Sequence, residues 1–282
     1  MISIKKISLF LLLWGIILPL AAQETEPPVA LTYQSSLVGI GRAKVYDSYL
    51  SPLSYSGTHI GFLFEQMKQT GLCEKKIFAQ HQLNATFADA KNPAGTAEDY
   101  AGALTYNYGL YYRFPEIKRF QFFAGGQIGG LFGMLYNSRN GNNPVDVKAD
   151  FSFNLSGIAA YRMQIKQQLV NLRYQINVLV AGGLLSPEYG QSYYEIGLGE
   201  GGSYAYFASL HNRIAINQLL SVEFPFQICT LRFSFSHRFY QTNINDLQTQ
   251  LIDRAIYIGL SRNFYTVRGK QSTSNHYRYV FE

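Results

Sequence analysis

The chain has few residues of the kinds that bind metals and little excess charge. Its 282 residues include only two Cys and five His, and their spacing fits no metal site. The formal net charge of +6 falls to +4 without Lys5 and Lys6 of the N-terminal segment. Such a weak and scattered excess argues against nucleic acid as a partner. We therefore expect no metal, no other cofactor and no nucleic-acid partner.

Long apolar runs are also missing, apart from one at the N-terminus. That run, Ile7 to Leu18, follows Lys5 and Lys6 and is followed by small residues ending at Ala22. This is the order of a secretory signal, and we predict cleavage after Ala22. The run is too short for a comfortable membrane span, and no Cys near the cleavage site can accept a lipid. An exported chain that is 47% apolar, with 22 Tyr and 20 Phe, is then expected to carry its membrane affinity in alternating strands.

Strict alternation is clearest in the stretch Gln168 to Leu185. Its side chains have a period of two, which is typical of a strand with one apolar face, here called oily, and one polar face, here called wet. The oily face holds Val170, Leu172, Tyr174, Ile176, Val178 and Val180. The wet face holds Asn171, Arg173, Gln175 and Asn177.

The same pattern recurs about ten times, which predicts an all-β fold, an antiparallel transmembrane β-barrel. We predict ten strands, with eight or twelve as alternatives, joined by short periplasmic turns and longer extracellular loops. The localisation is then the outer membrane of a Gram-negative cell. The expected organisation is a signal peptide (1–22), an N-terminal periplasmic segment (23–31), the barrel (32–265) and a basic polar C-terminal tail (266–282).

Several strand boundaries follow from where alternation fades. The first strand is expected from Tyr33 to Arg42, followed by a long loop from Lys44 to Gly57. The eighth strand is expected to run unbroken from Tyr206 to Phe224, and a loop from Asn243 to Gln250 precedes the tenth. The longest loop, Ser186 to Ser203, is rich in Tyr and Glu and has no basic residue.

The two cysteines, Cys73 and Cys229, fall in periplasmic turns several strands apart. An oxidising compartment would permit a disulfide, but a bridge requires neighbouring Cα atoms. We therefore expect two free thiols.

Turn positions also predict pairing. A turn at Gln164 to Gln167 places the wet face of the opening stretch beside the sixth strand. In that register Asn171, Arg173, Gln175 and Asn177 lie opposite Ala160, Ile158, Ser156 and Asn154. A turn between Gln227 and Ile228 places Glu223 directly opposite Arg232, and we predict a cross-strand ion pair there.

Polar and charged residues on the inward face are the candidate site. They are Glu65, Asp150, Arg162, Asn171, Arg173, Gln175, His211, Arg213, Glu223, Arg232 and Arg238. A barrel little wider than eight strands is nearly filled by its own side chains, so we predict an ion-pair plug and a structural or interaction role. The alternative is a small pore whose basic lining favours anions.

A second alternative is an outer-membrane lipid hydrolase or acyltransferase. Such an enzyme needs a nucleophile and a base within hydrogen-bond reach. Ser209 and His211 are two residues apart and share a face, but the alternation places that face inside, away from lipid. His81 and His237 are expected on the lipid face, and neither has a Ser two residues away. We therefore assign no catalytic residue.

Outer-membrane lipid is the expected surrounding of the barrel. An envelope protein is a further expected partner, bound through the extracellular loops or the C-terminal tail.

Three segments carry a family resemblance: YLSPLSYSG (Tyr49 to Gly57), FASLHN (Phe207 to Asn212) and SVEFPF (Ser221 to Phe226). They resemble an outer-membrane barrel family of Bacteroidota known only as a domain of unknown function, which would span most of the mature chain. The resemblance implies a Gram-negative outer-membrane protein. It implies no activity, cofactor or catalytic residue.

Overall fold

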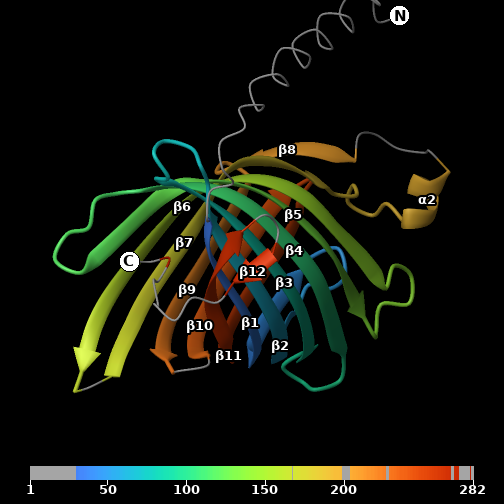
Figure 1. The fold of residues 1–282 in the computed structure, drawn as a ribbon. Coiled ribbons are helices and arrows are strands. Elements are labelled where there is room, and N and C mark those ends of the chain that lie inside the picture. The colour runs from blue at the N-terminus through green and yellow to red at the C-terminus, as the bar shows by residue number, and fades with distance from the viewer. Residues whose placement is uncertain are drawn as a thin grey trace, which may run out of the picture.

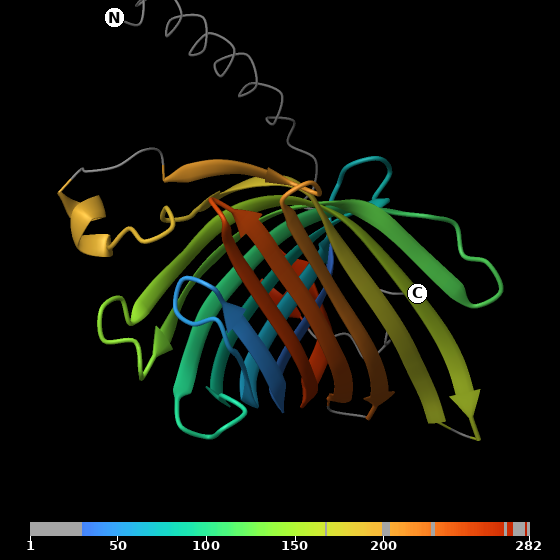
Figure 2. The same ribbon diagram turned by 180° about the vertical axis from the view of Figure 1, so that it is seen from behind.

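A computed structural model describes residues 30–166, 168–198, 204–226, 229–267, 270–272 and 280. Nearly all of them lie in strands that wrap around a common axis (Figures 1 and 2). The strands are β1 (Ala30–Asp47), β2 (Ser54–Gln69), β3 (Ile77–Lys91), β4 (Glu98–Arg113), β5 (Phe120–Asn137), β6 (Val145–Ile165), β7 (Gln168–Leu185), β8 (Ala205–Ser209), β9 (Arg213–Pro225), β10 (Thr230–Ile244), β11 (Leu247–Val267) and β12 (Lys270–Ser272). Helix α2 (Tyr193–Gly197) lies between β7 and β8. Within the described ranges, no helix has the length and apolar character required to cross a membrane.

The sheet closes because β1 pairs antiparallel with β11 along its whole length, from Ala30 opposite Thr266 to Asp47 opposite Thr249. Every other neighbour is also antiparallel, in chain order. β8 pairs with the last residues of β7, and β9 pairs with its first half. β8 and β9 thus share one position in the circle, and β12 only adds three residues beside the end of β11. The predicted closed antiparallel barrel of ten strands is confirmed.

The barrel has two ends, which we name by what they hold. The entry end holds Ala30, where β1 begins, and the α2 end holds the long connection between β7 and β8. In Figure 1 the β6–β7 hairpin lies at lower left and α2 lies at right. The two cysteines lie at the entry end and are both free, as expected.

Several predicted loops were too long. β1 continues to Asp47, so the loop predicted over Lys44 to Gly57 shrinks to residues 48–53. The loop predicted over Asn243 to Gln250 is a two-residue turn, Asn245–Asp246, with both residues at positive φ (56° and 59°). Such a turn matches the twist of a hairpin. Alternation of apolar and polar residues did not reveal these strand ends, because their outward side chains are polar. The backbone hydrogen bonds between the strands nevertheless continue there. The connections at the α2 end are therefore longer than those at the entry end mainly because of the connection between β7 and β8.

The outer wall of the barrel is apolar and the interior is polar, the reverse of a water-soluble domain. Among the exposed side chains, Phe132 and Leu155 have exposed fractions of 66% and 65%. Glu65, Arg173 and Arg232 lie inside with exposed fractions of 1% or less. His81 lies on the outer face as expected, where its Nδ1 is 2.7 Å from the hydroxyl of Tyr106. A contiguous apolar wall of this kind fits contact with lipid.

The two predicted registers had different outcomes. Glu223 lies opposite Arg232, as predicted. The predicted register between β6 and β7 was wrong by two residues, because β6 continues to Ile165 and β7 begins at Gln168. The wet face of β7 lies opposite Arg162, Ala160, Ile158 and Ser156. A shift of two residues keeps every side chain on its face, so the assignment of faces in β7 is unaffected.

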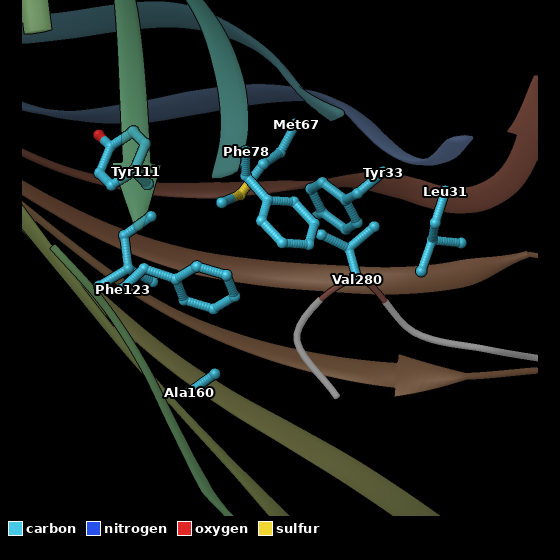
Figure 3. Close-up of a cluster of buried hydrophobic side chains, with 9 residues drawn as sticks. Leu31, Tyr33, Met67, Phe78, Tyr111, Phe123, Ala160 and Val280 are labelled. Carbon is cyan, nitrogen blue, oxygen red and sulfur yellow. The ribbon is translucent and has the colours of Figure 1, made fainter. Parts of the chain in front are cut away.

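The interior at the entry end is hydrophobic. Figure 3 shows this cluster, in which Val280 lies beside Tyr33 and Leu31. The other members are Met67, Phe78, Tyr111, Phe123, Ile158 and Ala160. The tail, expected as a periplasmic or edge extension from residue 266, thus contributes β12 to the sheet edge and Val280 to the interior. The predicted signal peptide, residues 1–22, lies outside the described residues.

Tyr257 packs across two glycines, and this generates a stability prediction. A Cβ on Gly39 would lie 2.5 Å from the Tyr257 ring, and one on Gly61 would lie 2.1 Å from its hydroxyl. We expect Gly39→Ala and Gly61→Ala each to lower the free energy of unfolding by about 1–3 kcal/mol through overpacking. Denaturant titration in detergent or lipid measures this change. Gly102→Ala is the matched control, because its Cβ meets open space. Equal unfolding midpoints for all three variants would contradict the packing argument.

Candidate functional site

In the half of the barrel interior nearer the entry end, one carboxylate holds two guanidinium groups. Glu65 of β2 is bonded to Arg173 of β7, and its other oxygen lies 2.7 Å from Arg232 Nη1 of β10. All three side chains are buried. A buried ion pair of this kind is tolerable only when hydrogen bonds satisfy its remaining polar groups. The next residues supply those bonds.

Amide side chains fill the interior around Glu65. Gln80 Nε2 donates to Glu65 Oε1 at 2.5 Å, and Gln175 Nε2 donates to Gln80 Oε1 at 3.0 Å. Tyr111 donates to Gln80 Oε1 at 2.8 Å, and Gln127 Nε2 donates to the Tyr111 hydroxyl at 2.7 Å. The bond between Gln175 on β7 and Gln80 on β3 crosses the interior, and the others join neighbouring strands from β2 to β5. We call Glu65, Arg173, Arg232, Gln80 and Gln175 the plug.

Glu223 supplies the second acidic group of this region. Its Oε1 accepts a hydrogen bond of 2.5 Å from the Tyr33 hydroxyl and lies 3.7 Å from Arg232 Nε. The predicted pair of Glu223 and Arg232 therefore exists, but the shorter contact of Arg232 is with Glu65. Two guanidinium groups and two carboxylates meet in this region, so their formal charges cancel.

Between the plug and the α2 end lies a cavity of about 140 Å³. Gln175 of the plug contributes to its lining, so the plug forms its floor. Two ion pairs lie in its wall: Arg213 with Asp150 at 2.8 Å, and Arg238 with Asp253 at 2.7 Å. His59 also lines it, with Nδ1 at 3.3 Å from Asp253 Oδ1. Most other lining groups are amides, hydroxyls and small apolar side chains, which suits a small polar solute.

The rim of this cavity is tied to the connection that carries α2. Lys148 lines the cavity and lies 2.7 Å from Asp47 and 2.6 Å from Asp146. Tyr193 of α2 donates to Asp146 Oδ1 at 2.7 Å, and its ring meets Tyr49 edge-on, with centroids 6.0 Å apart. Burial, and next the nearby Asp146, raise the pKa of Tyr49 to about 12. Both tyrosines therefore remain protonated donors at neutral pH.

The structure divides the predicted site residues into groups. Glu65, Arg173, Gln175, Glu223 and Arg232 lie in or beside the plug. Asp150, Arg213 and Arg238 line the cavity.

Two of the predicted residues lie nearer the entry end. Asn171 is buried there, opposite Arg162 on β6. Arg162 lines a separate pocket of about 220 Å³ with Glu116 and Arg119.

His211 does not face the interior, and this corrects the predicted inward set. A turn over Ser209 to Asn212 separates β8 from β9, closed by the Asn212 amide donating to the Ser209 carbonyl at 3.0 Å. In β9 the even positions face outward, but in β8 the odd positions do, since Ala208 is fully buried and Phe207 is 67% exposed. Regular alternation along a strand cannot change in this way without an interruption such as a bulge or a turn. Ser209 and His211 therefore lie on the outer side, with Ser209 Oγ 2.6 Å from His211 Nδ1.

Some site residues were not predicted. Tyr33, Gln80 and Tyr111 complete the plug region, and Asp253 completes the cavity wall. Each lies at a position that the alternation of its strand assigns to the inward face. Alternation alone could therefore have identified these residues as part of the interior. The contacts of Tyr33 with Glu223 and of Gln80 with Gln175 were not predictable, because they cross the lumen between strands that are not neighbours. Asp253, in contrast, lies directly opposite Arg238 on the neighbouring strand β10.

Comparisons with known proteins give a family. A family described as "Protein of unknown function (DUF3316)" matches residues 7–271, and no curated protein matches the chain. The match supports the unknown-function part of the resemblance, and the Bacteroidota source stays a prediction.

Solved structures with a similar fold share little sequence. The outer membrane protease OmpT from Escherichia coli is 8% identical, with a TM-score of 0.46, over 86% of this chain and 99% of that one. The β domain of the Bordetella autotransporter BrkA is 10% identical, with a TM-score of 0.42, over 84% and 100%. An outer membrane channel from Pseudomonas putida F1 is 8% identical, with a TM-score of 0.36, over 86% and 100%.

Removal of the central carboxylate should destabilise the barrel strongly. Glu65→Ala leaves the Arg173 and Arg232 guanidinium groups buried without their shared partner. We expect a loss of about 3–5 kcal/mol in the free energy of unfolding, measured by denaturant titration of the refolded protein. Glu74→Ala is the matched control, because its ion pair with Lys76 is exposed and pairs of that kind contribute little. A Glu65→Ala barrel as stable as the control would show that the plug is not a stabilising element.

Proposed function

We propose that this chain, which belongs to the DUF3316 family of proteins of unknown function, is a non-conducting outer-membrane barrel. It acts through interactions at the cell surface. The observation that carries this proposal is the plug. Glu65 and two arginines from different walls meet across the interior, and amides fill the space around them. A solute crossing the barrel would have to separate buried ion pairs.

The outer-membrane location rests on two features. The outer wall presents large apolar side chains all around the barrel, and water-soluble proteins rarely expose contiguous surfaces of this kind. The N-terminal segment has the order of a secretory signal. An exported barrel with a lipid-facing wall fits the outer membrane of a Gram-negative cell.

Charge pairing disfavours the alternative of an anion-favouring pore. A pore that selects anions needs cationic groups without compensating acids along its path. Arg213 and Arg238 are each bonded to an aspartate, and Lys148 lies between two. The two arginines of the plug meet Glu65 and Glu223. An acidic partner thus neutralises each of these five basic residues.

The α2 end is where we place the interactions. It holds the cavity above the plug and the connection that Tyr193 and Tyr49 tie to its rim. The cavity suits a small polar solute, and the connection suits an envelope protein that approaches from outside. The basic tail is a second contact for such a protein, on the periplasmic side.

Planar-bilayer recording tests whether the barrel conducts. We expect the wild-type barrel to give no stable channel events, because the plug fills the interior. The triple variant Glu65→Ala/Arg173→Ala/Arg232→Ala removes the three charged side chains of the plug together, while Glu223 keeps its hydrogen bond from Tyr33, and we expect it to conduct. Glu74→Gln/Lys76→Gln, which alters only an exposed pair, should stay silent. A stable anion-selective conductance in the wild type would overturn the proposal, whether or not the triple variant folds.

Cross-linking in intact cells tests the interaction role. We expect a protein partner to be recovered with the wild-type chain and lost when residues 186–198 are replaced by a Gly-Ser segment of equal length. Tyr193→Phe, which removes the hydrogen bonds that the hydroxyl makes with Asp146 and with the Val147 amide, should weaken recovery less. Recovery of the barrel alone with the connection intact would count against a protein partner.

A further inference from the structure

A serine and a histidine are hydrogen-bonded on the outer wall of the barrel. Ser209 ends β8, and His211 lies in the turn that follows, with Ser209 Oγ 2.6 Å from His211 Nδ1. His211 is exposed, and its ring stacks on that of Phe207 with centroids 6.5 Å apart. The change of parity between β8 and β9 places this pair on the side that meets lipid. Neither residue takes part in the plug or the cavity.

The surroundings of the pair are apolar. Phe207 and Leu210 have exposed fractions of 67% and 59%. Across the ladder, Ser209 lies opposite Ala181, which in turn lies opposite Phe153. Only a methyl group therefore separates the serine from the exposed ring of Phe153. Such a surface suits an acyl chain whose polar end reaches Ser209.

The turn holds the pair in position. Asn212 Oδ1 accepts from the Ser209 amide at 3.0 Å, and Asn212 Nδ2 donates to the Phe207 carbonyl at 3.0 Å. The Asn212 amide closes the turn onto the Ser209 carbonyl. A β-turn leaves the amides of its two central residues, here Leu210 and His211, outside its own hydrogen bond. They are the donors nearest to Ser209 for a developing oxyanion.

We propose that Ser209 and His211 hydrolyse ester-linked acyl chains of membrane lipids at the outer wall of the barrel. The Ser209 hydroxyl passes its proton to His211 Nδ1 while Oγ attacks the ester carbonyl. The bond to the lipid alcohol breaks, and the alcohol takes the proton from His211. Water then attacks the acyl-serine, passing its proton to His211, and the carboxylic acid leaves as Ser209 regains a proton. No metal or redox partner is required.

Labelling with an alkyl fluorophosphonate tests the nucleophile in the full chain, folded in detergent. We expect one adduct, located on Ser209 by mass spectrometry and absent from Ser209→Ala. His211→Gln should slow labelling about a hundredfold, the low end of what a general base contributes. Ser36→Ala is the matched control, because Ser36 is exposed on the outer wall of β1 and has no histidine bonded to it in any described contact.

Turnover is measured as fatty acid released from a diacyl phosphatidylethanolamine in mixed micelles. We expect release by wild type and Ser36→Ala, and none by Ser209→Ala. Heat-modifiable migration in electrophoresis verifies that each variant is folded. A folded wild type that leaves Ser209 unlabelled, labels it equally in His211→Gln, or releases no fatty acid would overturn the proposal. None of these results bears on whether the barrel conducts.

Discussion

Closure of the backbone ladder is the constraint on which this structure depends. A strand in lipid cannot leave its N–H and C=O groups unpaired, and pairing of β1 with β11 removes the last open edge of the circle. Ten positions make a lumen narrow enough for long side chains from opposite walls to meet. Glu65 can therefore bond Arg173 and Arg232 at once. The polar interior follows from the same closure, because the outer wall takes the apolar half of each strand.

The interruption between β8 and β9 is also the place where a serine and a histidine reach the outer wall. β9 continues the circle of strands by pairing with the first half of β7, whereas β8 pairs only with the last residues of β7. The turn between β8 and β9 reverses which positions face outward. It brings Ser209 and His211 out of the interior, where the plug and cavity already satisfy most polar groups, and places them beside apolar side chains. The interior and the outer wall can thus serve separate roles.

Sequence periodicity predicted much of the fold and part of the site. Alternation in β7 identified Arg173 and Gln175 as inward residues, and the turn position identified the pairing of Glu223 with Arg232. It did not predict that Arg232 binds Glu65 more closely, because β2 and β10 are not neighbours in the circle. It also misjudged strand ends with polar outer faces and missed the two-residue shift between β6 and β7.

The sequence by itself determined the period of the strands, and with it the barrel, its oily wall and most of its inward residues. A period of two is a local property, so it can be read along the chain. Only the tertiary structure decided which inward charges meet, because those contacts depend on the curvature of the closed sheet. It also decided the place of the opening stretch, Gln168 to Leu185: its Arg173 is one arm of the ion-pair plug, and its far end bears the strand that holds Ser209.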